Sequence, residues 1–222
     1  MIITRNLKKT FQTKKMAVHS INKVSFEARE GELTVLTGPS GGGKTVVLNM
    51  LAGFIKPDYG DIIIYGEYTS GWGWSRWNSF RRRYISYGTQ RNIFIPNISV
   101  EDNISLPLLM LGHEKSEVMD LVRDLMERLG IEYLYGRKTY TLSGGEQRRV
   151  MVARTLINDT PIILLDEPTA ELDEDSSKLV IDLINDFISR DKIFIVATHD
   201  KNLVNIGDRV IKIDRGYSTI IK

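Results

Sequence analysis

A glycine-rich octapeptide at residues 38–45 constrains the fold of this chain more than any other feature. It reads Gly-Pro-Ser-Gly-Gly-Gly-Lys-Thr and lies between a β-branched run at residues 32–37 and an apolar stretch with helical character at residues 46–52. A strand that passes through a glycine loop into a helix predicts a phosphate-binding loop of the Walker A type. A loop of this kind belongs to α/β folds, in which parallel strands alternate with helices.

The composition of the loop suits a nucleotide triphosphate with Mg²⁺. Glycines let the backbone amides turn toward phosphate oxygens, and the helix that follows adds the positive end of its dipole. Lys44 is expected to neutralise the β- and γ-phosphates, and the Thr45 hydroxyl to bind Mg²⁺. The expected nucleotide contacts are Gly38, Ser40, Gly41, Gly42, Gly43, Lys44 and Thr45. A glycine-rich turn with a chance lysine is the alternative, which the position between strand and helix disfavours.

Two acids follow a second buried run, Ile-Ile-Leu-Leu at residues 162–165. In open α/β sheets the carboxyl ends of the strands form the ligand crevice. Asp166 is therefore expected to hold hydrated Mg²⁺, and Glu167 to orient the attacking water or accept its proton. The alternative is a strand that runs into an acidic, solvated turn.

Alternating strands and helices extend through most of the chain. Strands are predicted at residues 32–37, 61–65, 84–87, 162–166, 192–197 and 209–213, with an antiparallel edge over residues 1–28 and a hairpin turn at 215–217. The strand pattern is lost between residues 93 and 155, where a helix over 117–129 is expected to end at Gly130. Its apolar face is predicted to consist of Val118, Leu121, Val122, Leu125, Met126 and Leu129.

These patterns predict an α/β fold with a phosphate-loop (RecA-like) parallel-sheet core, an N-terminal antiparallel β subdomain and an inserted α-helical subdomain. The whole chain, residues 1–222, is expected to be one domain. Residues 1–92 and 156–222 form the predicted nucleotide-binding core, and residues 93–155 the predicted helical subdomain.

The composition restricts the partners and the cellular location that we expect for this chain. Thirty basic and 28 acidic side chains leave a net charge of +2, so no global field indicates nucleic acid as a partner. Cysteine is absent, which excludes disulfides and thiolate chemistry and agrees with a reducing, cytoplasmic location. We expect no secretory signal at the N-terminus, and no apolar run approaches the roughly 20 residues of a membrane-spanning helix.

The octapeptide Leu-Ser-Gly-Gly-Glu-Gln-Arg-Arg at residues 142–149 precedes the acidic strand. It resembles the signature of ATP-binding cassette (ABC) proteins. On physical grounds, paired glycines at the start of a helix over 146–157 allow close backbone approach to a phosphate. An ordinary helix N-cap at Ser143 is the alternative.

The resemblance covers essentially the whole chain and implies roles for further residues. Gln90 would sense metal and water and link to the helical lobe, and His199 would contact the γ-phosphate. Asp173 would lie at a dimer seam, and Phe11 would stack on adenine, although an edge-strand core position is an alternative for Phe11. Ser143, Gly144 and Gly145 would contact the γ-phosphate of the opposite subunit.

In this family two subunits enclose two ATP molecules head to tail, and dimer closure and opening drive a separate membrane chain. The resemblance therefore implies an ATPase with ATP and Mg²⁺, a homodimer or a heterodimer with a similar subunit, and transmembrane permease subunits. It places the chain peripherally on the cytoplasmic face of the membrane. Residues 18–26 and 100–108 look most like the lipoprotein-releasing, macrolide-efflux and cell-division subunits. Glu171, where the family usually has a small residue, and Val46 after Thr45 depart from the pattern.

Two alternatives to a transporter subunit remain open for the function. The chain could be a soluble ABC ATPase of iron–sulfur assembly, or a regulatory subunit that transmits force without carrying cargo. The segment at residues 72–83 contains every tryptophan of the chain and an Arg-Arg-Arg run. It is expected to be either a short helix that buries its rings as a satellite cluster or a contact with the membrane or permease.

Overall fold

The computed structural model describes residues 1–12, 17–188 and 191–222, which form two compact units. The first unit contains Met1–Ile85, Pro161–Asp166 and Ile188–Lys222, and the second contains Ser86–Thr160 and Glu167–Phe187. None of the helices in the described ranges combines the length and apolarity that crossing a membrane requires.

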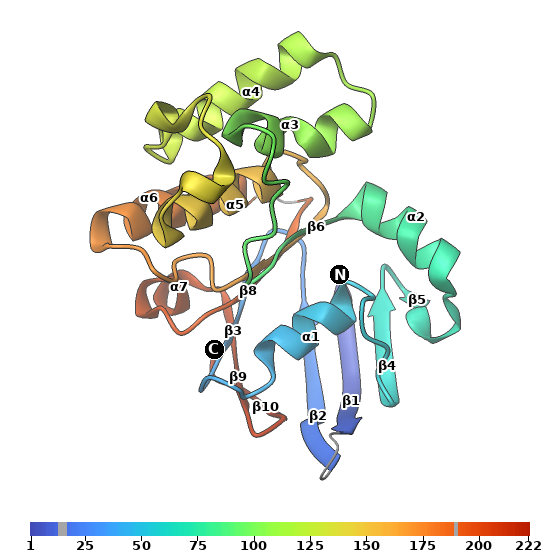
Figure 1. The fold of residues 1–222 in the computed structure, drawn as a ribbon. Helices are drawn as coiled ribbons and strands as arrows, with labels where there is room; N and C mark the ends of the chain where they lie inside the picture. The colour runs from blue at the N-terminus through green and yellow to red at the C-terminus, as the bar shows by residue number, and fades with distance from the viewer. Residues whose placement is uncertain (13–16, 189–190) are drawn as a thin grey trace. The chain divides into compact units, whose positions relative to one another are not determined.

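The first unit is built on a mixed sheet (Figure 1). Its strands are β1 (Ile2–Gln12), β2 (Ala17–Ala28), β3 (Leu33–Thr37), β4 (Tyr59–Ile64), β5 (Glu67–Tyr68), β7 (Ile162–Asp166), β8 (Ile193–Ala197), β9 (Arg209–Asp214) and β10 (Tyr217–Ile220). They follow the order β5-β4-β1-β2-β10-β9-β3-β8-β7. β6 (Ile85–Gly88) begins with Ile85, which belongs to the first unit, and its other residues belong to the second unit.

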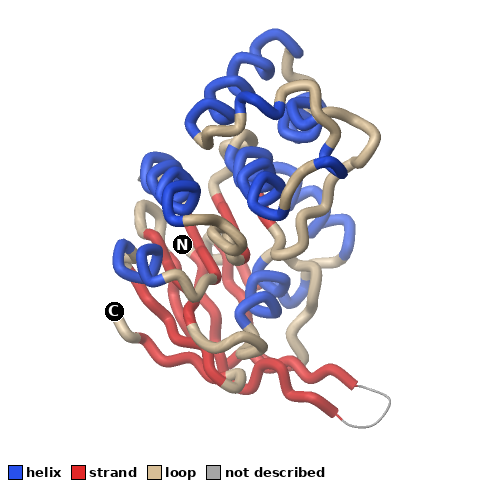
Figure 2. Tube along the Cα trace, turned by 60° about the vertical axis from the view of Figure 1, so that its left-hand side comes forward, coloured by secondary structure: helices blue, strands red, loops and turns tan. Residues whose placement is uncertain are grey.

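The sheet joins a parallel half to an antiparallel half. β9, β3, β8 and β7 run parallel, and every residue of β7 and β8 is buried, as expected for strands covered on both faces. β1 pairs antiparallel with β2 and β4, and Figure 2 shows β1 and β2 as a long two-stranded ribbon. The predicted parallel core with an antiparallel β edge is confirmed, as is the hairpin turn between β9 and β10.

Helices of the first unit are α1 (Lys44–Leu51), α2 (Trp74–Tyr84) and α7 (Lys201–Ile206), with a short 3₁₀ turn η1 (Thr69–Gly71) before α2. α1 contacts β2, β7 and β8 and buries Val47, Leu48 and Met50. The short helix predicted before the strand at 84–87 is α2, and the strand itself begins one residue later, at Ile85.

The second unit is mainly helical. It contains α3 (Val100–Met110), α4 (Lys115–Arg128), α5 (Gly144–Leu156) and α6 (Glu174–Phe187), together with the 3₁₀ turns η2 (Glu132–Leu134) and η3 (Thr139–Thr141). α3, α4 and α5 contact one another, and α5 also contacts α6.

One predicted face in this unit is wrong at a single position. Leu121 of α4 is 51% exposed, whereas Val118, Val122, Leu125, Met126 and Leu129 are buried as expected. Because successive residues turn by about 100°, the buried arc centres between Val118 and Val122 and reaches Met119 on its other side. Met119, which the prediction omitted, is buried at the opposite edge of this face from Leu121.

Candidate active site

The phosphate loop lies between β3 and α1, as predicted. Gly38 and Gly43 have φ of 134° and 108°, a region that L side chains rarely adopt. Close packing also requires them, since a Cβ at Gly38 would lie 2.0 Å from the Ile213 carbonyl oxygen and one at Gly43 would lie 2.7 Å from that of Ser20. The backbone of the loop is therefore held by β9 and β2.

The side of the loop formed by Ser40 and Gly41 leaves room for a ligand. A Cβ at Gly41 would meet nothing within 4 Å, and Ser40 is exposed, so this side of the loop is open. α1 has neither an acidic residue in its first turn nor a side-chain cap, and its N-terminal amides are suited to an anion. Gly42 is buried in the turn, where its N–H donates to the Pro39 carbonyl at 3.0 Å.

Lys44 is buried and bends back over the loop. Its Nζ donates to the carbonyl oxygens of Gly38 at 2.9 Å and Pro39 at 3.3 Å. The ammonium group is thus held at the loop that was predicted to bind phosphate, and a phosphate oxygen is a charge-assisted acceptor for the same group.

Strand register brings three functional segments to one level of the sheet. Asp166 at the end of β7 pairs with Ala197 of β8, and Ala197 pairs with Leu36 of β3. The phosphate loop follows Leu36 by two residues, and His199 follows Ala197 by two. Since the carboxyl ends of parallel strands form the ligand crevice, Asp166, His199 and the loop lie at the expected edge.

The donor set at this edge fits Mg²⁺ held jointly with phosphate oxygens. No cluster of three or more histidine, cysteine or acidic side chains that could bind a metal occurs within the described residues. Asp166 is fully buried at the end of β7, and Thr45 lies half-buried in the first turn of α1, the helix that contacts β7. One carboxylate and one hydroxyl leave most of the coordination to water and substrate phosphates, which Mg²⁺ prefers.

Phe11 lies near the end of β1, with 38% of its surface exposed and the Lys9 ammonium 5.8 Å from its ring centroid. Lys9 pairs with Ile21, whose Cδ1 would lie 2.6 Å from a Cβ at Gly43. Phe11 is therefore on the hairpin that borders the phosphate loop, and its ring is exposed rather than in the core.

In the second unit, Gln90 is exposed and its loop is fastened to α5. The buried Arg148 donates from Nη2 to the Gln90 carbonyl at 2.8 Å and from Nη1 to the Thr89 carbonyl at 3.4 Å. Any shift of the signature helix would therefore be transmitted to the backbone at Gln90.

The signature residues form the N-terminus of α5, where the predicted alternative of a helix cap is also realised. Ser143 and Glu146 form a capping box: Ser143 N donates to Glu146 Oε2 at 2.7 Å, and Glu146 N donates to Ser143 Oγ at 3.3 Å. Burial alone would raise the pKa of Glu146, but hydrogen bonds from Ser143 and Tyr133 outweigh it, and the pKa is lowered.

The segment that follows β7 has unusual backbone conformations. Glu167 is 9% exposed and has a φ angle of 52°. This backbone conformation is strained for a residue other than glycine, and such strain is often found at functional sites. Glu171 has φ of 66°, and its Oε2 would lie 2.1 Å from a Cβ at Gly144. A Cβ at Gly145 would lie 3.1 Å from the Glu171 carbonyl oxygen.

Asp173 caps α6 in the same segment. It accepts from Ser176 N at 2.7 Å and from Ser176 Oγ at 3.2 Å, and these hydrogen bonds lower the pKa of Asp173. The carboxylate therefore has a structural partner within the chain.

Sequence reasoning did not assign three residues that shape the site. Arg148 was part of the quoted signature but received no role. Asn103, fully buried, donates to the carbonyls of Ile95 and Ser99 and so orders the loop after Gln90. Glu101 accepts from Gly136 N at 2.9 Å. The available signal was the group of polar residues Glu101, Asp102 and Asn103 at the start of a helix that is mainly apolar after them.

Comparison with known proteins agrees with this arrangement. Residues 21–170 match the family described as ABC transporter. The lipoprotein-releasing system ATP-binding protein LolD of Chromohalobacter salexigens is 31% identical over 97% of this chain and 92% of its own length. The macrolide export ATP-binding/permease protein MacB of Shewanella sp. is 33% identical over 94% of this chain and 32% of its own length.

A solved structure extends the likeness to three dimensions. The dimeric, post-hydrolysis ATP-binding cassette MJ0796, bound to ADP and Pi, has a TM-score of 0.91 and 28% sequence identity, and the match covers 100% of this chain and 99% of that one. Fold and site define an ATP-binding, ATP-hydrolysing cassette of the α/β class. The chain belongs to the ABC transporter family, as an ATP-binding subunit.

Proposed function

We propose that two copies of this chain, or one copy and a similar subunit, close head to tail on two molecules of MgATP and thereby drive a separate transmembrane permease. The observation that carries the proposal is the register that sets Asp166 and His199 level with the phosphate loop. The dimeric state of the MJ0796 cassette and the combined ATP-binding/permease name of MacB support the assembly.

Each half of the site has a separate task in this proposal. The loop Gly38, Ser40, Gly41, Gly42 and Gly43 surrounds the phosphates, and Lys44 neutralises the β- and γ-phosphates. Phe11 stacks on adenine, and Ser143, Gly144 and Gly145 close over the γ-phosphate bound by the opposite subunit. Close backbone approach at both glycine-rich segments is the physical reason for these residues.

Hydrolysis needs a positioned water and stabilisation of charge on the transferred phosphoryl group. Glu167 orients the water and accepts its proton, while His199 and Gln90 contact the γ-phosphate and the water. Mg²⁺, held by Thr45, Asp166 and Gln90 together with phosphate oxygens, would supply charge neutralisation. The buried setting of Asp166 and Glu167 strengthens these interactions, because water screens them less.

The organisation proposed from the sequence assigns residues 1–92 and 156–222 to the nucleotide-binding core and residues 93–155 to a helical subdomain. The bond from Arg148 to Gln90 supports coupling between the signature helix and the segment expected to face the permease. In this arrangement the chain lies on the cytoplasmic face of the membrane through its partner.

Replacing Lys44 tests the phosphate-loop assignment. Lys44→Ala should lower MgATP hydrolysis at least about 100-fold, because it removes the cation that meets the charge of the phosphates. Lys178→Ala, at an exposed position of α6, is the matched control and should keep wild-type activity. Circular dichroism checks the fold of both proteins. Hydrolysis by Lys44→Ala within about twofold of wild type would rule out this assignment.

A further inference from the structure

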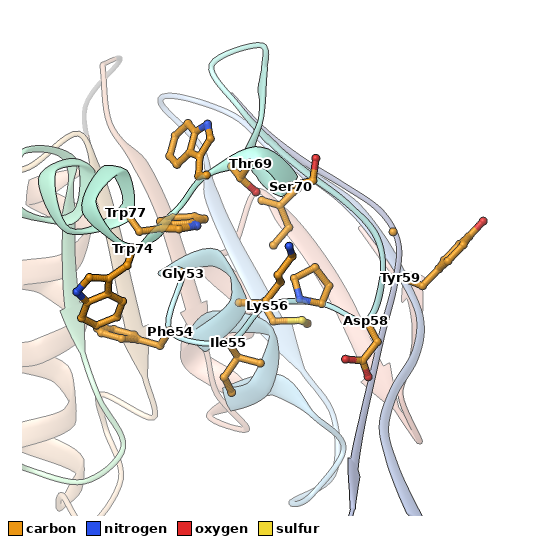
Figure 3. Close-up of a pocket in the computed structure, with 15 residues that line it drawn as sticks. Gly53, Phe54, Ile55, Lys56, Asp58, Tyr59, Thr69, Ser70, Trp74 and Trp77 are labelled. Atoms are coloured by element: carbon orange, nitrogen blue, oxygen red, sulfur yellow. The ribbon is translucent and has the colours of Figure 1, made fainter.

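The last part of β1 is anchored to the segment before β4 by a single residue, Asp58. It precedes Tyr59, the first residue of β4, and Figure 3 shows these two neighbours along a pocket that both line, with their side chains pointing in different directions. The Asp58 carboxylate accepts from Lys9 Nζ at 2.7 Å and from Thr10 N at 2.8 Å. Asp58 N donates to the Lys8 carbonyl at 2.9 Å. One residue therefore holds three consecutive residues of β1.

Regular strand pairing ends where this anchor begins. The register between β1 and β4 is irregular, and Lys8 with Tyr59 is the pair farthest along β1. The register between β1 and β2 shifts twice between residues 7 and 10. Shifts of this kind bend a strand and change the direction in which its side chains point. Thr10 lies beyond the ladder with β4, so the Asp58 carboxylate supplies the acceptor that a neighbouring strand would otherwise supply.

Lys9 connects the same carboxylate to the ring of Phe11. The two residues are two positions apart on β1 and therefore share a face of the strand. The Lys9 ammonium lies over the Phe11 ring, 5.8 Å from its centroid, which is within the range of cation–π attraction. The Lys9 side chain is only 18% exposed, against 48% for Asp58. The ammonium is thus confined beside the ring, and Asp58 holds it there.

The position of the Phe11 ring depends on this support. The ring is 38% exposed, so close packing fixes it less than it fixes a core side chain, and the backbone that carries it matters more. The hydrogen bond from Lys9, followed by that from Thr10 N, lowers the pKa of Asp58. The carboxylate is therefore charged at neutral pH and accepts from both donors.

We propose that Asp58 is a positioning residue for nucleotide binding, which fixes the end of β1 so that the ring of Phe11 is presented to adenine. Thr10 N and the Lys9 ammonium are the two links through which it acts. The inference rests on the proposed function, in which Phe11 stacks on adenine. A ring that is already fixed loses less conformational freedom when the base binds, so the affinity for the base is higher. An ion pair that only stabilised the hairpin would have no selective effect on adenine.

Two ligands separate these effects in the intact chain. MgADP carries adenine and is not hydrolysed, whereas magnesium pyrophosphate has the phosphates without the base, and calorimetry gives a dissociation constant for each. Asp58→Ala should weaken MgADP about three- to tenfold and leave pyrophosphate within about twofold of wild type. Asp58→Asn keeps an oxygen that accepts from Thr10 N, so it should bind MgADP more tightly than Asp58→Ala does. Retained binding of pyrophosphate also shows that the phosphate loop is folded in each variant.

Glu27→Ala is the matched control. It removes a carboxylate of similar exposure, 43% against 48%, that pairs with Arg29 in the same unit, and it should change neither dissociation constant. A double-mutant cycle tests the route: in a Phe11→Ala protein, adding Asp58→Ala should weaken MgADP by no more than about twofold. Losses that multiply in the double variant would show that Asp58 does not act through Phe11 and would overturn the proposal. Equal weakening of MgADP and pyrophosphate by Asp58→Ala would overturn it as well.

Phe11→Ala alone separates this inference from the proposed function. If it weakens MgADP and Asp58→Ala does not, the positioning role is refuted and the adenine contact stands. If Phe11→Ala leaves the MgADP affinity unchanged, the adenine contact of the proposed function is refuted, and the positioning role with it. A loss that both single variants share, and that the double variant does not increase, supports both.

Discussion

Glu171 illustrates how one residue can modify a phosphate-binding site of this family. Its carboxylate lies against Gly144, at the N-terminus of α5, where the positive end of the helix dipole favours a negative charge. In the proposed dimer the same place receives the γ-phosphate of the nucleotide bound by the opposite subunit. The carboxylate and the phosphate would repel each other, so Glu171 is expected to oppose closure.

Removing that charge should therefore favour the dimer. In a Glu167→Gln protein, Glu171→Ala should tighten ATP-dependent dimerisation about two- to fivefold, measured as a dimer dissociation constant by sedimentation. Glu174→Ala, which removes an exposed acid from the first turn of α6, serves as the matched control. An unchanged or weaker dimer with Glu171→Ala would contradict this role.

At the scale of the element, the start of α5 depends on its capping box. Glu146→Ala should lower the free energy of unfolding by about 1 kcal/mol, measured by urea denaturation at pH 7. Glu127→Ala, at an exposed position of α4, is the control and should have a smaller effect. An equal loss from both substitutions would show that the capping box is not the cause.

The same element predicts a pH dependence. Because the pKa of Glu146 in the folded protein is lowered, its carboxylate contributes stability above its ordinary pKa, and this contribution is lost as pH falls through the folded-state value. The difference between wild type and Glu146→Ala should therefore be full at pH 7 and shrink below about pH 4.

Elements differ in how far the sequence predicts them. The strand at 162–166 was predicted to the residue, because an unbroken apolar run bounded by an acid leaves little choice. Leu121 was misplaced because periodicity locates an apolar face only to within one position at its edge. The packing of Trp77 on Gly53 joins residues 24 positions apart, and no local pattern contains it.

At the scale of the whole molecule, the phosphate loop and the acidic strand were predictable because each has a local pattern with a physical reason. The pairing register that places Asp166 and Leu36 level with Ala197 could not be predicted from the sequence, because it depends on the order of the strands within the sheet. For residues 72–83 the sequence left two alternatives, a short helix that buries its rings as a satellite cluster or a contact with the membrane or permease. The short helix is present as α2, and the rings of Trp72 and Trp77 contact each other but are only half-buried. The ring of Trp74 lies outside this cluster and is 72% exposed.

The central claim is that ATP joins two subunits and that Glu167 is needed to cleave it. Glu167→Gln keeps the shape of the side chain but removes the carboxylate, so ATP should bind and remain intact. Size-exclusion or sedimentation with MgATP should then show a stable dimer, absent with ADP and absent when Ser143→Arg is added, because ligand-linked association persists only while the ligand is bound. A Glu167→Gln protein that binds ATP yet stays monomeric at high concentration, or hydrolyses ATP at the wild-type rate, would contradict the account.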